Sequence, residues 1–96
     1  MSDRMPENHI LQAALAIYGP DMQKIVAIEE LSELQKELCK SLRCADNVSR
    51  IAEEIADVQI MLDQMVMLFG CSEETEKWRA DKIERLKIRM AAVPSV

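Results

Sequence analysis

Two short acidic segments set among apolar residues constrain the fold of this 96-residue chain more than any other feature. One contains Glu30 and Glu33, and the other contains Glu54 and Asp57. Residues three positions apart lie on the same side of an α-helix, so each pair of carboxylates fits one helical face. The interval 34–53 has room for the end of one helix, a turn and the start of a second helix that runs back. The sequence therefore predicts an antiparallel helix pair on which the four carboxylates converge.

Four converging carboxylates repel one another unless a cation lies between them. Ligation by oxygen atoms alone suits Mg²⁺, with Mn²⁺ as a substitute. The alternative is an ordinary solvated helix surface, because single acid pairs with this spacing often arise by chance. Two such pairs, both bordering apolar stripes, favour the metal site over the solvated surface.

The composition is typical of an all-α protein. Aromatic residues make up 3% of the chain and there are only two Gly, whereas 49% of the residues are hydrophobic and seven are Met. Few residues are strand-favouring aromatics or turn-forming glycines, so helices are expected instead of a sheet. We predict one domain over 1–96 with an ordered core of about 8–90, and helices over about 6–18, 20–42, 47–69 and from 72 to shortly before Pro94.

Helical periodicity predicts which faces are buried. In the second helix the expected core stripe lies beside a more polar strip, and Glu30 lies at their border while Glu29 points to solvent. The core stripe is Ala27, Leu31, Leu34, Leu38 and Leu42, and the polar strip is Gln23, Val26, Glu30, Glu33 and Glu37. The expected stripe of the third helix is Val48, Ile51, Ile55, Val58, Leu62 and Met65. Beyond Ile55 this helix is apolar nearly all round, which predicts an antiparallel bundle completed in a homodimer or homotetramer.

Charge and cysteine content limit the function classes. The net charge of −5 argues against direct binding of a nucleic-acid backbone. Cys39, Cys44 and Cys71 form no CxxC pattern, and with His9 as the single histidine a zinc site is not expected. The sequence begins with no secretory leader and has no apolar run near the roughly 18 residues that a membrane span needs. We therefore expect a cytoplasmic protein with reduced thiols and no membrane contact.

The residues around the acid pairs resemble a known family. The segments 28–34 (IEELSEL) and 53–58 (EEIADV) are similar to the EExxE…ExxD signature of the all-α nucleoside triphosphate pyrophosphohydrolases, in the MazG-like branch. Short single-domain forms from phages and bacteria look closest. The likeness covers about 10–89, and it includes Tyr18-Gly19, Gln23, the run 55–61 and the run 82–86.

The resemblance implies a helical, oligomeric enzyme that hydrolyses a nucleoside or deoxynucleoside triphosphate to the monophosphate and pyrophosphate with Mg²⁺. It implies Glu30, Glu33, Glu54 and Asp57 as metal ligands. Glu29 matches the first acid of the signature and would orient water or support the ligands. Glu29 and Glu30 are accordingly the candidate catalytic residues, because a carboxylate near the metal could accept a proton from water.

Three further residues are candidates for substrate binding. Lys82 and Arg85 share one side of the last helix and could bind phosphate oxygens, or they could belong to a solvated basic surface. Gln23 lies on the same strip as Glu30 and could contact a base edge or a water, or it could be a plain surface residue. Two other functions stay open: a non-catalytic helical oligomerisation or regulatory module, and a pyrophosphohydrolase specific for dUTP, dCTP or phosphoribosyl-ATP.

Overall fold

The structure is a computed structural model that describes residues 6–43 and 45–94, and within these ranges it contains helices and no strands. The predicted all-α class is confirmed. The helices are α1 (Glu7–Tyr18), α2 (Pro20–Ser41), α3 (Val48–Phe69) and α4 (Ser72–Ala91). Cys44 lies outside the described residues, as do positions 1–5 and 95–96.

The helix boundaries follow local chemistry. Gly19 has φ 87° and separates α1 from α2, and Pro20 occupies the first turn of α2, where its missing N–H costs nothing. Gly70 ends α3 in the left-handed conformation, with φ 60°, and its N–H donates to the carbonyl of Met67. These sequence-predicted breaks are confirmed.

The residues that precede three of the helices have different roles. Pro6 precedes α1 as its N-cap residue and is not its first helical residue. Cys71 occupies the N-cap position of α4, which begins at Ser72 as predicted. Asn47 does precede α3, but its side chain makes no capping hydrogen bond. Its amide is used elsewhere, because it donates to Glu37 across the turn.

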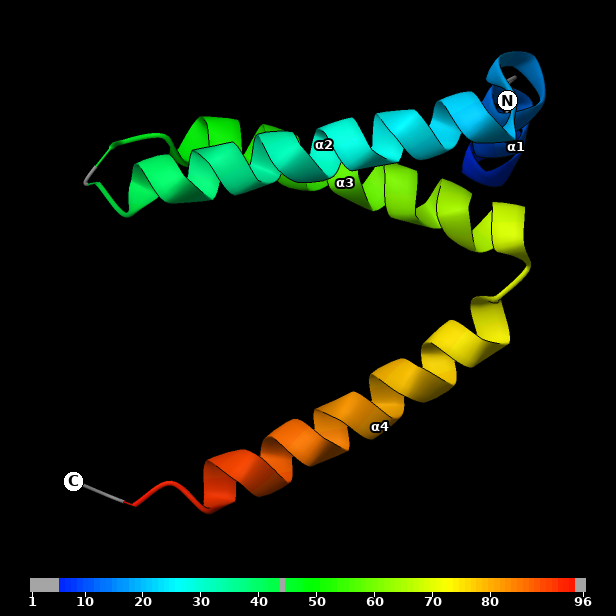
Figure 1. Ribbon diagram of the computed structural model, residues 1–96. Coiled ribbons are helices and arrows are strands. Elements are labelled where there is room, and N and C mark those ends of the chain that lie inside the picture. Colours follow the sequence, from blue (N-terminus) through cyan, green and yellow to red (C-terminus); the bar gives the residue numbers. More distant parts are fainter. Residues whose placement is uncertain (1–5, 44, 95–96) are drawn as a thin grey trace, which may run out of the picture.

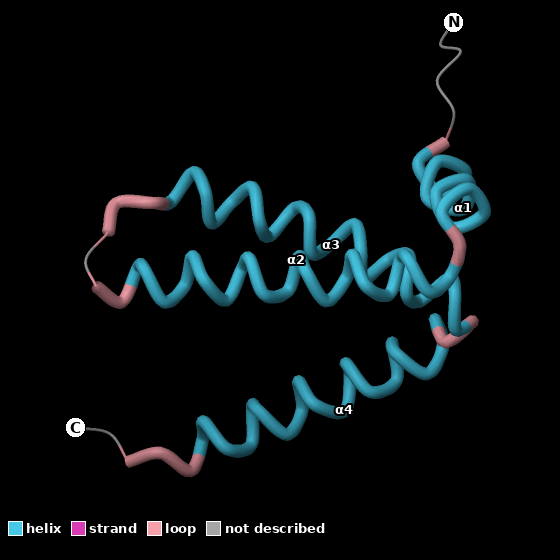
Figure 2. The backbone as a smooth tube through the Cα atoms, turned by 45° about the horizontal axis from the view of Figure 1, so that its top comes forward, coloured by secondary structure: helices cyan, strands magenta, loops and turns pink. Residues whose placement is uncertain are grey.

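The helices α2 and α3 form an antiparallel hairpin that runs the length of the molecule (Figure 1). The helix α1 lies across the end of the hairpin remote from the turn 42–47, which we call the open end. The helix α4 leaves the end of α3 and diverges from the hairpin, and a view turned by 45° shows the same separation (Figure 2). No residue of α4 is buried.

Of the predicted core stripe of α2, Ala27 is buried as expected, but three of its four leucines are exposed. The other buried residues of α2, Gln23 and Glu37, belong to the predicted polar strip, so that strip faces α3 together with Ala27. Leu31, Leu38 and Leu42 are 48%, 47% and 85% exposed. In α3 likewise, the predicted stripe residues Val48, Ile55 and Leu62 are exposed, although Val58 is buried as expected. Periodicity predicted two neighbouring strips on α2 but could not tell which of them α3 would cover.

The single chain is far more open than a compact domain of its size. Its radius of gyration is 17.3 Å, against about 12.5 Å for a compact chain of this length. Its accessible surface is 8076 Å², against roughly 5,600 Å² for a folded monomer of this mass. None of the helices within residues 6–43 and 45–94 has the length and apolar character needed to cross a membrane.

Candidate metal centre

The predicted acids meet along the line of contact between α2 and α3. Glu30 and Asp57 are half-buried, and Glu54 lies one turn before Asp57 on the same helix. One carboxylate oxygen from each of these three residues lies within 4.8 Å of the other two. We call Glu30, Glu54 and Asp57 the acid cluster. The hairpin thus brings together three of the four acids that the spacing predicted to converge.

Within the acid cluster, Glu54 has an unusual environment. Its Oε2 atom is buried and has no hydrogen-bond partner among the described residues. A buried carboxylate oxygen without a partner is costly, because it has lost hydration and gained nothing in return. An oxygen of this kind is where a cation would be accommodated most readily.

The surroundings of the acid cluster favour the protonated forms of its two glutamates. Burial raises the pKa of Glu30, and a hydrogen bond with Asp57 and the charges of Asp57, Glu54 and Glu33 raise it further. Burial also raises the pKa of Glu54, and nearby acids, Asp57 and Glu33 foremost, add to the effect. Both carboxyls therefore hold protons more tightly than an isolated glutamate does. A divalent cation would reverse this, because it favours the charged forms.

The donor set fits a hard cation. All three groups offer carboxylate oxygens, which Mg²⁺ and Mn²⁺ prefer, and the described residues bring no histidine or thiol into the cluster. Glu30, Glu54 and Asp57 would hold the ion. Glu33 is exposed and is not part of the three-residue group, although its charge raises the pKa of both Glu30 and Glu54. The structure thus assembles three of the four predicted ligands, and the fourth lies nearby at the surface.

Two polar contacts flank the acid cluster along the hairpin, and residue spacing predicted neither of them. Towards the open end, the Nε2 atom of Gln23 donates to the Oε1 atom of Gln64 at 2.7 Å, and both residues are buried. Towards the turn, the Nδ2 atom of Asn47 donates to the carbonyl oxygen and to Oε1 of Glu37, each at 2.9 Å. Gln64 could have been singled out from the sequence, because it is a polar residue within the mostly apolar run 58–69.

Glu37 is a buried acid with the opposite electrostatics. The hydrogen bond from Asn47 lowers its pKa, and so does the hydrogen bond from Lys40, whose Nζ lies 3.2 Å from Oε2. The charged form of Glu37 is therefore stabilised by hydrogen-bond donors, whereas the surroundings of Glu30 and Glu54 disfavour their charged forms. This contrast separates Glu30 and Glu54, whose pKa values are raised, from Glu37, whose hydrogen-bond donors lower its pKa.

Replacing Asn47 with Ala is expected to lower the melting temperature by several degrees, because a buried carboxylate and a carbonyl lose a shared donor. Thermal denaturation followed by circular dichroism measures the change. Asp46→Ala is the matched control, since Asp46 is exposed in the same turn. Equal melting temperatures for the two variants would contradict a bracing role for Asn47.

The other predicted site residues lie apart from the acid cluster. Glu29 is exposed, as expected. Lys82 and Arg85 lie on α4, where they line a shallow hollow with Ile88 and Arg89. Arg85 pairs with Asp81 at 2.9 Å, and Lys82 lies over the ring of Trp78. Because α4 diverges from the hairpin, the single chain does not bring these cations to the carboxylates (Figure 1).

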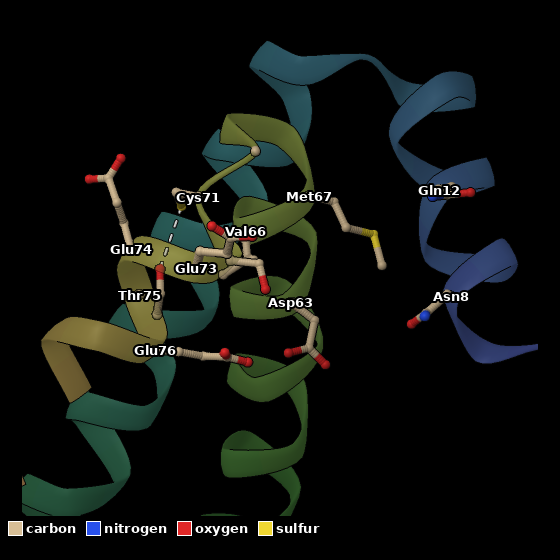
Figure 3. Close-up of a pocket in the computed structure, with 12 residues that line it drawn as sticks. Asn8, Gln12, Asp63, Val66, Met67, Cys71, Glu73, Glu74, Thr75 and Glu76 are labelled. Atoms are coloured by element: carbon tan, nitrogen blue, oxygen red, sulfur yellow. Dashed lines mark hydrogen bonds between the residues drawn. The ribbon is translucent and has the colours of Figure 1, made fainter. Parts of the chain in front are cut away.

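A larger hollow, of about 860 Å³, lies where α1, the end of α3 and the start of α4 meet (Figure 3). Asn8 and Gln12 approach it from α1, and Met67 lies on its α3 wall. Its lining carries the acids Asp63, Glu73, Glu74 and Glu76 and no basic residue. Among the described residues, these acids do not form a group whose oxygens lie close enough together to hold a cation, so the hollow is not a second candidate metal centre.

Comparison of the chain with models of protein families, with curated proteins and with solved structures found no match.

Proposed function

We propose that this chain is a Mg²⁺-dependent nucleoside triphosphate pyrophosphohydrolase of the MazG-like kind, acting as a homo-oligomer. The observation that carries the proposal is the acid cluster with the unpartnered, buried Oε2 atom of Glu54. Acidic surfaces alone are common, but an acid buried without a partner beside two others calls for a cation. The resemblance of the two acidic segments supplies the reaction class.

The reaction joins a water oxygen to the α-phosphorus and breaks its bond to the oxygen that bridges to the β-phosphorus, which yields a monophosphate and pyrophosphate. When bound, Mg²⁺ would supply positive charge to the triphosphate oxygens. A carboxylate oxygen of Glu30 that does not hold the ion is suited to accept the proton of the attacking water, because Glu30 lies within the acid cluster and its ionised form is a base. Glu29 precedes it at the surface and would orient that water.

A second copy of the chain is part of the proposal, because extended apolar surface is uncovered. One side of the hairpin carries exposed apolar side chains from both helices, and Lys24 of α2 lies 5.2 Å from the ring centroid of Phe69 of α3 on this side. We call this surface the hairpin face: Leu31, Leu38, Val48, Ile55, Leu62 and Phe69. The single chain exposes roughly 2,500 Å² more than a compact monomer of its mass, and burial of part of this excess on each of two subunits would reach the roughly 2,000 Å², counted over both partners, of an obligate interface.

A second copy also offers a source for the cations that the acid cluster lacks. Phosphate binding by Lys82 and Arg85 requires α4 to approach a hairpin, and its own hairpin is remote. In an oligomer, α4 of one subunit could pack near the acid cluster of another. The assembly would then bury apolar residues of α4 such as Ile83 and Leu86, which the single chain leaves exposed.

Pyrophosphate release from a panel of NTPs and dNTPs with Mg²⁺ tests the proposal. The parent is expected to release pyrophosphate and the monophosphate from at least one substrate, and Glu54→Gln is expected to lower the rate at least about 100-fold. The panel includes dUTP, dCTP and phosphoribosyl-ATP, so it also separates the specificities that the sequence leaves open. Inorganic phosphate without pyrophosphate, unchanged by the substitution, would contradict the reaction.

The second candidate is a non-catalytic oligomerisation module, and the exposed hairpin face favours it independently of the acids. The two candidates differ in the role of the carboxylates. An oligomerisation module would assemble through its apolar faces. Adding Mg²⁺ or Mn²⁺ would then stabilise the parent protein no more than a variant that lacks one acid of the acid cluster.

A further inference from the structure

The Gln23–Gln64 hydrogen bond is the most deeply buried polar contact between α2 and α3. The two residues are 5% and 3% exposed, and the Nε2 atom of Gln64 also lies 3.7 Å from the sulfur of Met61. Neither amide touches the acid cluster directly. A buried amide pair gains little net free energy over apolar side chains of the same size, so its chief consequence is to fix one relative placement of the two helices.

The position of the pair relates it to the acids. Gln23 precedes Glu30 by two helical turns, and Gln64 follows Asp57 by two turns, so each glutamine lies on the same face as an acid at about 10.5 Å along its helix. In an antiparallel pair, a contact between Gln23 and Gln64 therefore sets Glu30 opposite Asp57. The same register continues towards the turn, where the charge of Arg50 acts on Glu37.

The acid cluster itself works against this register. Glu30, Glu54 and Asp57 repel one another, and the apolar contacts of Ala27 and Val58 beside them have no directional preference. The turn and the Asn47–Glu37 contact hold one end of the hairpin. At the open end, α1 lies across the helices with Leu11 as its buried residue. The glutamine pair is the directional contact between α2 and α3 on that side of the acids.

We propose that Gln23 and Gln64 are positioning residues that lock the open end of the hairpin, so that Glu30 stays opposite Asp57 despite their repulsion. The consequence for metal binding rests on the proposed function, whereas the consequence for helix placement does not. Gln23, which the sequence offered as a substrate contact, then acts through Gln64 and the hairpin instead.

The test replaces both amides with apolar side chains of similar length, Gln23→Met with Gln64→Met, so that neither is left unpaired. The matched control is Gln35→Met with Gln59→Met, which makes the same change at exposed positions of the same helices. Calorimetric titration with Mn²⁺ alone is expected to show about a tenfold weaker affinity for the lock variant and no change for the control. If this variant melts at or above the melting temperature of the parent, its weaker Mn²⁺ binding reflects lost positioning of the acids and not lost stability.

A second readout needs no metal. Spin labels at Asp21→Cys and Asp63→Cys, with Cys39, Cys44 and Cys71 replaced by Ser, report the separation of α2 and α3 near the glutamines. Labelled chain is diluted into unlabelled chain so that only distances within one chain contribute. We expect a narrow distribution with the glutamines and a broader or shifted one with the two Met substitutions. If the Met pair prevents folding, the corresponding Leu pair takes its place.

An unchanged distance distribution overturns the proposal, and so does an unchanged Mn²⁺ affinity in a variant whose helices have moved. If the parent binds no Mn²⁺, the proposed function fails, and the distance measurement alone decides whether the glutamines set the placement of the helices.

Discussion

Saturating Mn²⁺ or Mg²⁺ is expected to raise the melting temperature of the parent protein by about 10–20 °C. A ligand at 100 times its dissociation constant stabilises the state that binds it by about 2.7 kcal/mol, and each kcal/mol shifts the melting temperature of a domain of this size by about 4–8 °C. The structural reason is the uncompensated acid cluster, in which a cation would relieve repulsion and supply the partner that Glu54 lacks. Differential scanning fluorimetry over a metal titration measures the shift.

The variant Glu54→Gln should respond in the opposite way. It should lose the metal-dependent shift, and without metal at pH 7 it should melt a few degrees above the parent, because a buried and repelled charge is gone. Glu53→Gln is the matched control, since Glu53 is exposed and raises the pKa of Glu54 less than Asp57 or Glu33 does, so it should change both quantities far less than Glu54→Gln. A parent that gains nothing from metal, or a Glu54→Gln variant that gains as much as the parent, would contradict the metal centre.

The same experiment has a defined pH dependence. The pKa values of Glu30 and Glu54 are raised above 4.5 in the folded state, so the folded protein holds these protons more tightly than the unfolded chain. Their favourable contribution is complete below about pH 4.5 and is lost as the pH rises through the raised values. The advantage of Glu54→Gln over the parent should therefore shrink as the pH falls towards 4.5. Glu37, with its lowered pKa, contributes in the opposite direction and loses its contribution in acid.

Leu62→Glu is expected to weaken self-association at least about 100-fold, because it puts a charge into the middle of the hairpin face, and a symmetric interface contains the change twice. Sedimentation velocity over a range of concentrations measures the association. Gln59→Glu adds the same charge at an exposed polar position of α3 and should leave the assembly intact. A parent that is monomeric at millimolar concentration would contradict the proposed oligomer.

This variant also tests whether the site is shared between subunits. If α4 of one copy supplies Lys82 and Arg85 to another, Leu62→Glu should lose pyrophosphate release at concentrations where it is monomeric. Its activity should recover as the concentration is raised into the range where it associates. A monomer with the parent's activity would place the whole site within one chain.

Local chemistry was enough to predict the helices and the acid pairs. Pro20, Gly19 and Gly70 act within their own turns, so their effects can be inferred without knowledge of the rest of the fold. The convergence of Glu30 with Glu54 and Asp57 was also predictable, because residue spacing and a short turn leave an antiparallel pair few registers. The half-burial of Glu30 and the exposure of Glu29 follow from the same periodicity.

The tertiary structure decided which stripe of each helix is covered. Sequence periodicity shows that a helix has an apolar side, but it carries no information on whether that side meets the same chain or another one. Here the intrachain contact covers Gln23, Ala27 and Glu37, and Leu31 and Leu38 are left exposed. The partners of individual polar groups were decided in the same way: Asn47 contacts Glu37, Gln23 contacts Gln64, and Glu54 is left with a bare oxygen. Spacing along the chain determines which residues can meet, and only the packing of one helix against another determines which of them do.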